Sequence, residues 1–334
     1  MQDVRERGNP ALGGRLRLGV SSPLLSRPGA VAADPPDTGV AAHYGDPYAE
    51  QRALERGVAR VDLSHRGVVR VAGPDRLSWL HSLVSQHVAS LAPGQPVEAL
   101  VLSPQGRVEH HLHLVDDGEA VLAHVEPGTA AALVDFLDRM RFMLRVEVTD
   151  VTPSYAVVAD PLMRLVPREE LGSYEGAVAG VQAHEALRVA ARVPRLGVDT
   201  DHRTIPHEVG WLASAVHLDK GCYRGQETVA RVHNLGRPPR RLVLLHLDGS
   251  DSELPTTGDA VQLDGRDVGR VGTAVRHHEL GPVALALVKR NVPDDAELVA
   301  GGVAARIDPE PAVEVPMSPA RQAAAAREGL MRFR

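Results

Sequence analysis

The stretch "HLDKGCYRGQETVARVHNLG", residues 217–236, is the most informative segment of this 334-residue chain. It contains Cys222, the only cysteine, with Lys220 before the thiol and Arg224 after it. Two nearby cations are able to stabilise a thiolate. A single cysteine excludes an internal disulfide, and it excludes a zinc or iron–sulfur site built from the thiolates of this chain alone.

Glycines and a predicted helix surround the thiol. Gly221 and Gly225 would let the backbone approach a ligand closely. Residues 226–235 have a helical pattern closed by Gly236, so a helix N-terminus with its positive field would lie beside Cys222. Three interpretations compete: a packed small hydrophobic side chain, a reactive or metal-contacting thiol in an anion-binding loop, and a ligand-binding loop in which the cysteine is incidental. The spacing alone does not separate the last two.

The segments around this stretch predict an α+β body followed by a small barrel. Strands and amphipathic helices alternate in residues 41–236, which indicates mixed or antiparallel sheets in two subdomains. Short strands with Asp-Gly turns fill residues 237–315 and are typical of a β-barrel. We predict strands over 67–73, 97–103 and 106–115 and helices over 74–91 and 128–142.

The two ends of the chain differ from the body. Residues 1–40 mix Gly, Pro, Ser and charge, so we expect a partly disordered N-terminal arm whose second half could pack on the body. Residues 316–334 form an Ala- and Arg-rich tail. The prolines of the stretch 236–241 mark the boundary before the barrel.

Composition excludes several classes of protein. The net charge of -6 argues against a basic nucleic-acid-binding protein, and an aromatic content of 3% argues against broad base-stacking platforms. No apolar run reaches the roughly 18 residues that a membrane span needs, and no apolar signal region follows the N-terminal arginines. We therefore expect a soluble, cytoplasmic and monomeric protein that does not bind nucleic acid directly.

The stretch "KGCYRGQE", residues 220–227, closely resembles the signature of the YgfZ family, folate-binding proteins related to the aminomethyltransferase of the glycine cleavage system. Other segments resemble the family in the same order, and the resemblance covers roughly residues 43–315. These segments are 59–83, with the opening Asp-x-Ser, 141–152, with an Arg-Phe strand, 185–208, with the Glu-x-x-Arg helix and the Ile-Pro-x-Glu turn, and 268–290, in the barrel.

The resemblance implies a GcvT-like body in which the subdomains surround a central channel that binds tetrahydrofolate or a derivative. It also implies a role in assembly or repair of iron–sulfur enzymes, including tRNA-modifying ones, with assembly proteins or client enzymes as partners. The candidate catalytic residues are Cys222, as a reactive thiol, and Lys220. The candidate folate-binding residues are Lys220, Gly221, Cys222, Tyr223, Gly225, Gln226, Glu227, Arg188 and His111.

The acidic residues of the aminomethyltransferase branch are missing. Alignment on Gly106 places His110 and His111 where that branch has an acidic pair, and Ala190 replaces the acid of its helix motif. On an alternating strand, Glu109 would share a face with His111. This argues against standard glycine-cleavage chemistry. A folate-dependent one-carbon transferase stays the alternative to an accessory protein.

His111 and His113 lie two residues apart on one face of a predicted strand. That spacing is able to hold zinc. No third ligand is evident from the sequence, so we expect no intrinsic metal.

Overall fold

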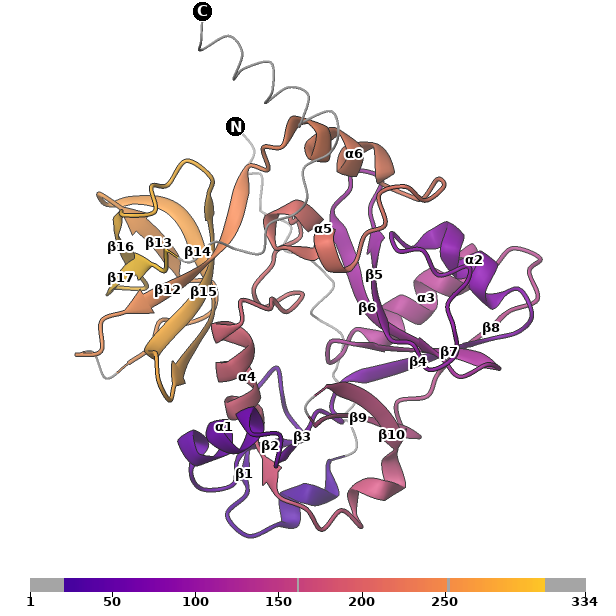
Figure 1. Ribbon diagram of the computed structural model, residues 1–334, viewed down its shortest axis with the longest axis horizontal. Coiled ribbons are helices and arrows are strands. Elements are labelled where there is room, and N and C mark those ends of the chain that lie inside the picture. Colours follow the sequence, from indigo (N-terminus) through magenta and orange to yellow (C-terminus); the bar gives the residue numbers. More distant parts are fainter. Residues whose placement is uncertain (1–20, 161, 251–252, 310–334) are drawn as a thin grey trace, which may run out of the picture.

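The computed structural model describes residues 21–160, 162–250 and 253–309. They form three lobes around a common centre (Figure 1): one built on a five-stranded sheet, one on a four-stranded sheet, and a closed barrel. The prediction of an α+β body followed by a small C-terminal barrel is confirmed. The expected tail, and residues 1–20 of the expected arm, lie outside the described residues.

The five-stranded sheet is antiparallel throughout, in the order β5-β6-β7-β4-β8. Its outer face packs on helices α2 and α3. There, Leu112 and Leu114 belong to a core that includes Trp79 of α2 and Leu133 of α3. The other face, which we call the inner face, packs on α5 (Trp211–Ser214) through Leu100. The elements are β4 (Gly67–Ala72), α2 (Arg76–Leu83), β5 (Val97–Leu102), β6 (Val108–Asp116), β7 (Ala120–Val125), α3 (Ala130–Met140) and β8 (Glu147–Asp150).

Helix α2 is shorter than predicted. The sequence pattern predicts a helix over 74–91, but α2 ends at Leu83. Ser85 turns the chain away, because its hydroxyl donates to the carbonyl of Ala215 at 2.6 Å and accepts from the amide of Leu100 at 2.9 Å. Long-range hydrogen bonds therefore override the local helical pattern.

The second sheet has the order β10-β9-β3-β11, and β11 runs parallel to β3. Asp46 caps α1, since its side chain accepts from the amides of Tyr48 and Ala49 and Pro47 begins the helix. The lobe contains β3 (Arg60–Asp62), α1 (Pro47–Glu55), β9 (Tyr155–Ala159), β10 (Met163–Pro167), η3 (Arg168–Leu171), β11 (Val178–Ala179) and α4 (Val181–Ala190).

The second half of the expected N-terminal arm lies against this lobe. Residues 21–40 contain η2 (Pro23–Ser26) and β1 (Val31–Ala32), and β1 pairs with β2 (Ala41–His43). Leu24 of η2 is buried in a cluster with Val158 of β9. These residues therefore belong to the packed structure.

Helices connect the body to the barrel. The predicted helix over 226–235 is present as α6 (Gln226–Leu235), which ends at Gly236 in the left-handed conformation. The barrel closes in the order β12-β15-β14-β13-β16-β17. The remaining elements are η4 (Pro206–Glu208), β12 (Arg240–Leu247), β13 (Ala260–Leu263), β14 (Arg266–His277), β15 (Gly281–Lys289), β16 (Glu297–Ala300) and β17 (Val303–Ile307).

Candidate functional site

Lys220 anchors the segment 217–225, which we call the signature loop, to the end of α2. Its ammonium group donates to the carbonyl oxygens of His81 at 2.5 Å, Val84 at 2.5 Å and Gln86 at 3.2 Å. These carbonyls lie at the C-terminal end of α2 and just beyond it, where helix carbonyls lack intrahelical partners. Burial lowers the pKa of Lys220 to about 8. The three hydrogen bonds of the Lys220 ammonium group therefore hold the signature loop against the end of α2.

Tyr223 and Gly225 join the signature loop to the β5–β6 hairpin. Tyr223 is buried in a cluster with Val108 of β6, and burial raises the pKa of its hydroxyl to about 12. Gly225 has a φ of 83°, and a Cβ there would lie 2.5 Å from the carbonyl oxygen of Ser103. The close approach that requires Gly225 is therefore to the chain's own hairpin. A Cβ at Gly221 would meet nothing within 4 Å.

The thiol of Cys222 lies at the surface. The residue is exposed, so the interpretation of a packed hydrophobic side chain is wrong. Arg224 forms an ion pair with Glu109 of β6 at 3.0 Å, and Lys220 donates to carbonyls. Both flanking cations thus have partners other than the thiol. Gln226 and Glu227 begin α6, where Glu227 is exposed and suits the positive helix end.

Histidines and a glutamate gather on the inner face of the five-stranded sheet. Nε2 of His111 lies 3.2 Å from Oε2 of Glu98, and the His111 ring lies 4.6 Å from the ring of His113. His113 stacks on His124 with ring centroids 4.4 Å apart. The ring of His110 instead contacts Phe136 of α3, so the predicted alternation of His110 and His111 is present.

Burial and mutual contact set the charges of this cluster. Burial lowers the pKa of His113 and of His124 well below its ordinary value, so both imidazoles are neutral. Burial alone would raise the pKa of Glu98, but the hydrogen bonds from His111 and Ser214 and the electrostatic attraction of His111 and His113 together lower it to about 2. The ligand atoms of Glu98, His111 and His113 all lie within 4.8 Å of one another.

Arg188 lies in a buried ion network at the junction of the lobes. It bonds to Glu185, to Asp199 at 2.7 Å and to the hydroxyl of Thr273 in β14, and only 6% of its surface is exposed. Arg195 continues the network to Asp37 of the arm and to Glu126 and Glu185. The sequence predicts Arg188 as a folate contact; the structure places its guanidinium between α4 and the barrel.

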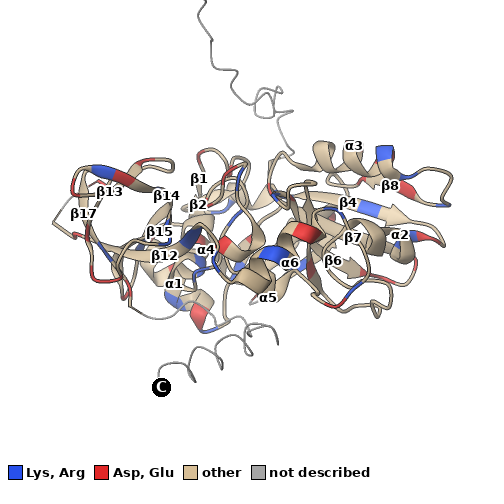
Figure 2. Cartoon of the chain, turned by 90° about the horizontal axis from the view of Figure 1, so that it is seen from above, with Lys and Arg blue, Asp and Glu red and all other residues tan. Residues whose placement is uncertain are grey.

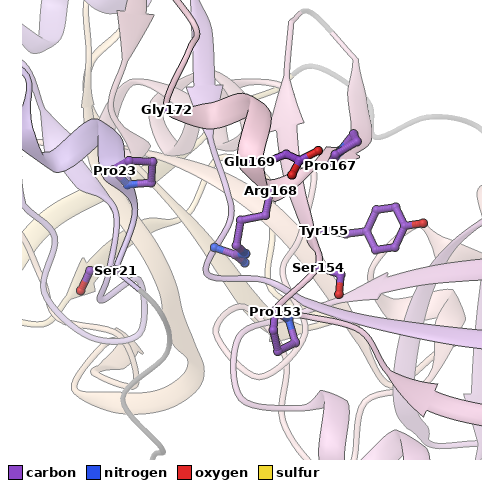
Figure 3. A pocket seen from close by; sticks show the side chains of 9 residues that line it. All are labelled: Ser21, Pro23, Pro153, Ser154, Tyr155, Pro167, Arg168, Glu169 and Gly172. Carbon is purple, nitrogen blue, oxygen red and sulfur yellow. The ribbon is translucent and has the colours of Figure 1, made fainter.

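Two cavities lie near this network and the arm. One, of about 580 Å³, lies between the arm, α1, α4 and β14, and its walls include Asp37, Tyr48, Glu185, Arg195, Thr273 and Arg276. The other, of about 660 Å³, lies between η2, η3 and β9 (Figure 3), and its walls include Ser21, Tyr155 and Arg168. None of the predicted site residues lines either of these two cavities.

In the view of Figure 2, segments with basic and with acidic residues are interspersed over all three lobes. No helix among the described residues is long and apolar enough to cross a membrane.

Comparison with known families finds a match in the first part of the body and another in the barrel. Residues 40–159 match the GCVT N-terminal domain, and residues 240–313 match the CAF17 C-terminal beta-barrel domain. The chain has the domain composition of the YgfZ/CAF17/IBA57 family. The resemblance of the chain to the YgfZ family is thereby confirmed by matches on either side of the stretch 220–227, and the fold is aminomethyltransferase-like.

Named relatives agree with this assignment. A mitochondrial protein of Mycosarcoma maydis, named as an iron-sulfur cluster assembly factor IBA57 homolog, is 29% identical over 222 residues, or 54% of this chain and 55% of that protein. A chloroplastic protein of Arabidopsis thaliana, named as a transferase, is 25% identical over 273 residues, or 66% of this chain and 62% of that protein. The chain thus spans little more than half the length of these two relatives.

Similarity to aminomethyltransferases covers more of the chain. The aminomethyltransferase of a Nostoc species is 26% identical over 306 residues, which are 72% of this chain and 79% of that enzyme. The crystal structure of the glycine cleavage system aminomethyltransferase T from Bartonella henselae superposes with a TM-score of 0.71 at 16% identity, over 85% of this chain and 94% of that one. The latter likeness concerns the fold alone.

Sequence reasoning did not find Glu98, His124 or Arg195 as partners of the predicted residues. Glu98 lies opposite His113, and His113 opposite His124, in the strand register. The alternation within β6 shows which residues share a face, but the identity of the neighbours depends on pairing with β5 and β7.

Proposed function

We propose that this chain is a tetrahydrofolate-binding accessory protein for the assembly or repair of iron–sulfur enzymes, including tRNA-modifying ones. The observation that carries the proposal is the combination of a GCVT N-terminal domain with a CAF17-type barrel. The fungal relative is named for iron–sulfur cluster assembly, and the Nostoc relative for aminomethyl transfer, a folate-linked reaction. Cytoplasmic location stays a prediction, because the two eukaryotic relatives are organellar proteins.

The cavity between α4 and the barrel is the place that we propose for folate. Its volume of about 580 Å³ suits a ligand of that size, and it lies at a junction of lobes, where ligand sites are frequent. Carboxylates such as Asp37 are suitable acceptors for the N–H groups of a pterin, and the guanidinium of Arg276 is a suitable donor to the carboxylates of the folate tail. Arg188 supports this wall from behind, through Glu185 and Thr273.

The exposed side of the signature loop is the surface that we propose for partner proteins. Cys222 is exposed, and so are Gly221 and Glu227, whereas Lys220 and Tyr223 are buried and hold the loop. A thiol at the surface is able to reach a metal centre on another protein. Ligand binding and partner contact would then occupy different places on the molecule.

Calorimetric titration of the full chain with tetrahydrofolate tests the ligand. We expect saturable binding at one site, weakened at least about tenfold by Arg276→Gln, because a charge-assisted hydrogen bond is lost. Arg290→Gln, which removes a cation outside the cavity, serves as the matched control and should leave the affinity unchanged. Absence of heat with the folded wild-type chain would contradict folate binding.

A one-carbon transferase is the second candidate, favoured by the likeness to aminomethyltransferases over most of the chain. The position of the acidic pair is occupied by His110, which faces α3, and His111, which faces α5, and the neighbouring carboxylate of Glu109 is paired with Arg224. Incubation with a methylene-tetrahydrofolate donor and small amines decides between the two. Transfer of the carbon unit would establish the enzyme, while binding without product for any donor supports the accessory role.

A further inference from the structure

The inner face of the five-stranded sheet carries a cluster with the composition of a metal site. We propose that Glu98, His111 and His113 bind a first-row divalent transition metal such as zinc or iron. This inference is independent of the proposed function and departs from the expectation of no intrinsic metal. It assigns His111 to the metal in place of the folate contact predicted from the resemblance.

The geometry of the three ligands supports the assignment. Nε2 of His111 and Oε2 of Glu98 are 3.2 Å apart. Two ligand atoms about 2.0 Å from one tetrahedral zinc ion are about 3.3 Å from each other, so this pair already has the required separation. All three ligand atoms lie within 4.8 Å of one another, so small side-chain rotations suffice to bring the third atom into place.

Adjacent strands hold the ligands rigidly. Glu98 of β5 is paired with His113 of β6, and Leu100 with His111, so all three ligands project from one hydrogen-bonded ladder. Sites built on strands are positioned more accurately than sites on loops. The cluster therefore does not depend on a mobile segment to come together.

Groups behind the ligands complete the arrangement. The hydroxyl of Ser214 donates to Oε2 of Glu98 at 2.7 Å, and the Trp211 ring packs 4.5 Å from that of His111. The ring of His124 lies parallel to that of His113, at an angle of 4°, and its buried Nδ1 has no hydrogen-bond partner among the described residues. Such outer groups orient metal ligands, and an orphaned nitrogen beside the cluster is consistent with a bound group there.

The ligand set indicates the class of metal. Two imidazoles and one carboxylate occur in catalytic zinc sites and in non-haem iron sites, and both leave coordination positions open. The Glu98 side chain is 34% exposed, so a water molecule or a small ligand is able to reach the metal from this side. Calcium and magnesium prefer oxygen ligands, whereas two of the three ligands in this cluster are nitrogen atoms.

Titration with Co²⁺ and competition with Zn²⁺ test the site. The full chain, free of any histidine tag and treated with a chelator, is titrated while the visible absorption of bound Co²⁺ is recorded. We expect one equivalent to bind, with affinity reduced at least about tenfold by Glu98→Gln and by His111→Gln. His110→Gln is the matched control, because the adjacent ring faces α3, and it should bind as the wild type does.

A second histidine cluster must be distinguished. Glu55, His277 and His278 also lie within ligand distance of one another, between α1 and the end of β14. Loss of binding in His277→Gln, or equal affinity in wild type, Glu98→Gln and His111→Gln, would overturn the assignment, as would absence of saturable binding. Thermal unfolding of each metal-free variant checks its fold. If His111→Gln fails to fold, Glu98→Gln decides, because the Glu98 side chain is partly exposed.

Discussion

At the scale of single residues, Lys220 and Cys222 have different roles in the signature loop: Lys220 anchors the loop, and Cys222 exposes a thiol at the surface. The sequence predicted cations that stabilise a thiolate, but Lys220 bonds to carbonyls of a turn more than a hundred residues earlier in the chain. Local spacing cannot reveal such a partner, because it depends on where α2 ends. The exposed thiol and the buried ammonium group therefore need separate tests.

Lys220→Met should destabilise the chain by about 1–3 kcal/mol, since three carbonyls lose their donor while the apolar part of the side chain is kept. Urea unfolding followed by circular dichroism measures this change. Arg224→Met, which breaks a half-exposed ion pair, should cost less than about 1 kcal/mol. Equal losses in the two variants would contradict the role of Lys220 as an anchor.

At the scale of elements, the contact between α6 and the β5–β6 hairpin fixes the signature loop. The sequence predicted both ends of α6 correctly, because the helical periodicity and the closing Gly236 are local features. It predicted α2 too long because the bonds of Ser85 that end the helix are long-range. The sequence placed His111 and His113 on one face of a strand, but it did not reveal Glu98 and His124 beside them, because these residues come from neighbouring strands.

Gly225→Ala should cost about 2–4 kcal/mol, because it combines a left-handed φ of 83° with a Cβ 2.5 Å from the Ser103 carbonyl oxygen. Gly221→Ala, four residues earlier in the same loop, should change stability by less than about 1 kcal/mol, because no atom lies within 4 Å of its Cβ. Chemical denaturation of both variants tests the contrast. A Gly221 variant as unstable as the Gly225 variant would show that the loop is packed differently.

At the scale of the whole molecule, the buried ion network connects the arm, both lobes of the body and the barrel. The strand and helix patterns predicted the succession of body and barrel, because periodicity along the chain is sufficient for that. They could not predict that Asp37 of the arm pairs with Arg195, or that Arg188 reaches Thr273 of the barrel. Docking of lobes depends on three-dimensional contacts between distant residues.

Stability should fall as the pH decreases from about 6.5 to about 4. Burial lowers the pKa of His184 and of His207 to about 4, from an ordinary value of 6.5. In this window the unfolded chain binds protons that the folded chain does not, at a cost of up to about 1.4 kcal/mol per pH unit for each histidine. Urea midpoints near pH 7 and near pH 5 measure the effect, and His184→Gln should reduce the slope. A midpoint that stays constant or rises in acid would contradict this account.

The most direct test of the proposed function compares Cys222→Ser with the wild type in two assays. One is the calorimetric affinity for tetrahydrofolate, and the other is the restoration of an iron–sulfur enzyme's activity in cells that lack the gene. Because Cys222 is exposed and does not line the cavity, we predict unchanged folate affinity together with lost restoration. Iron–sulfur enzymes that keep normal activity in cells without the gene would contradict the account.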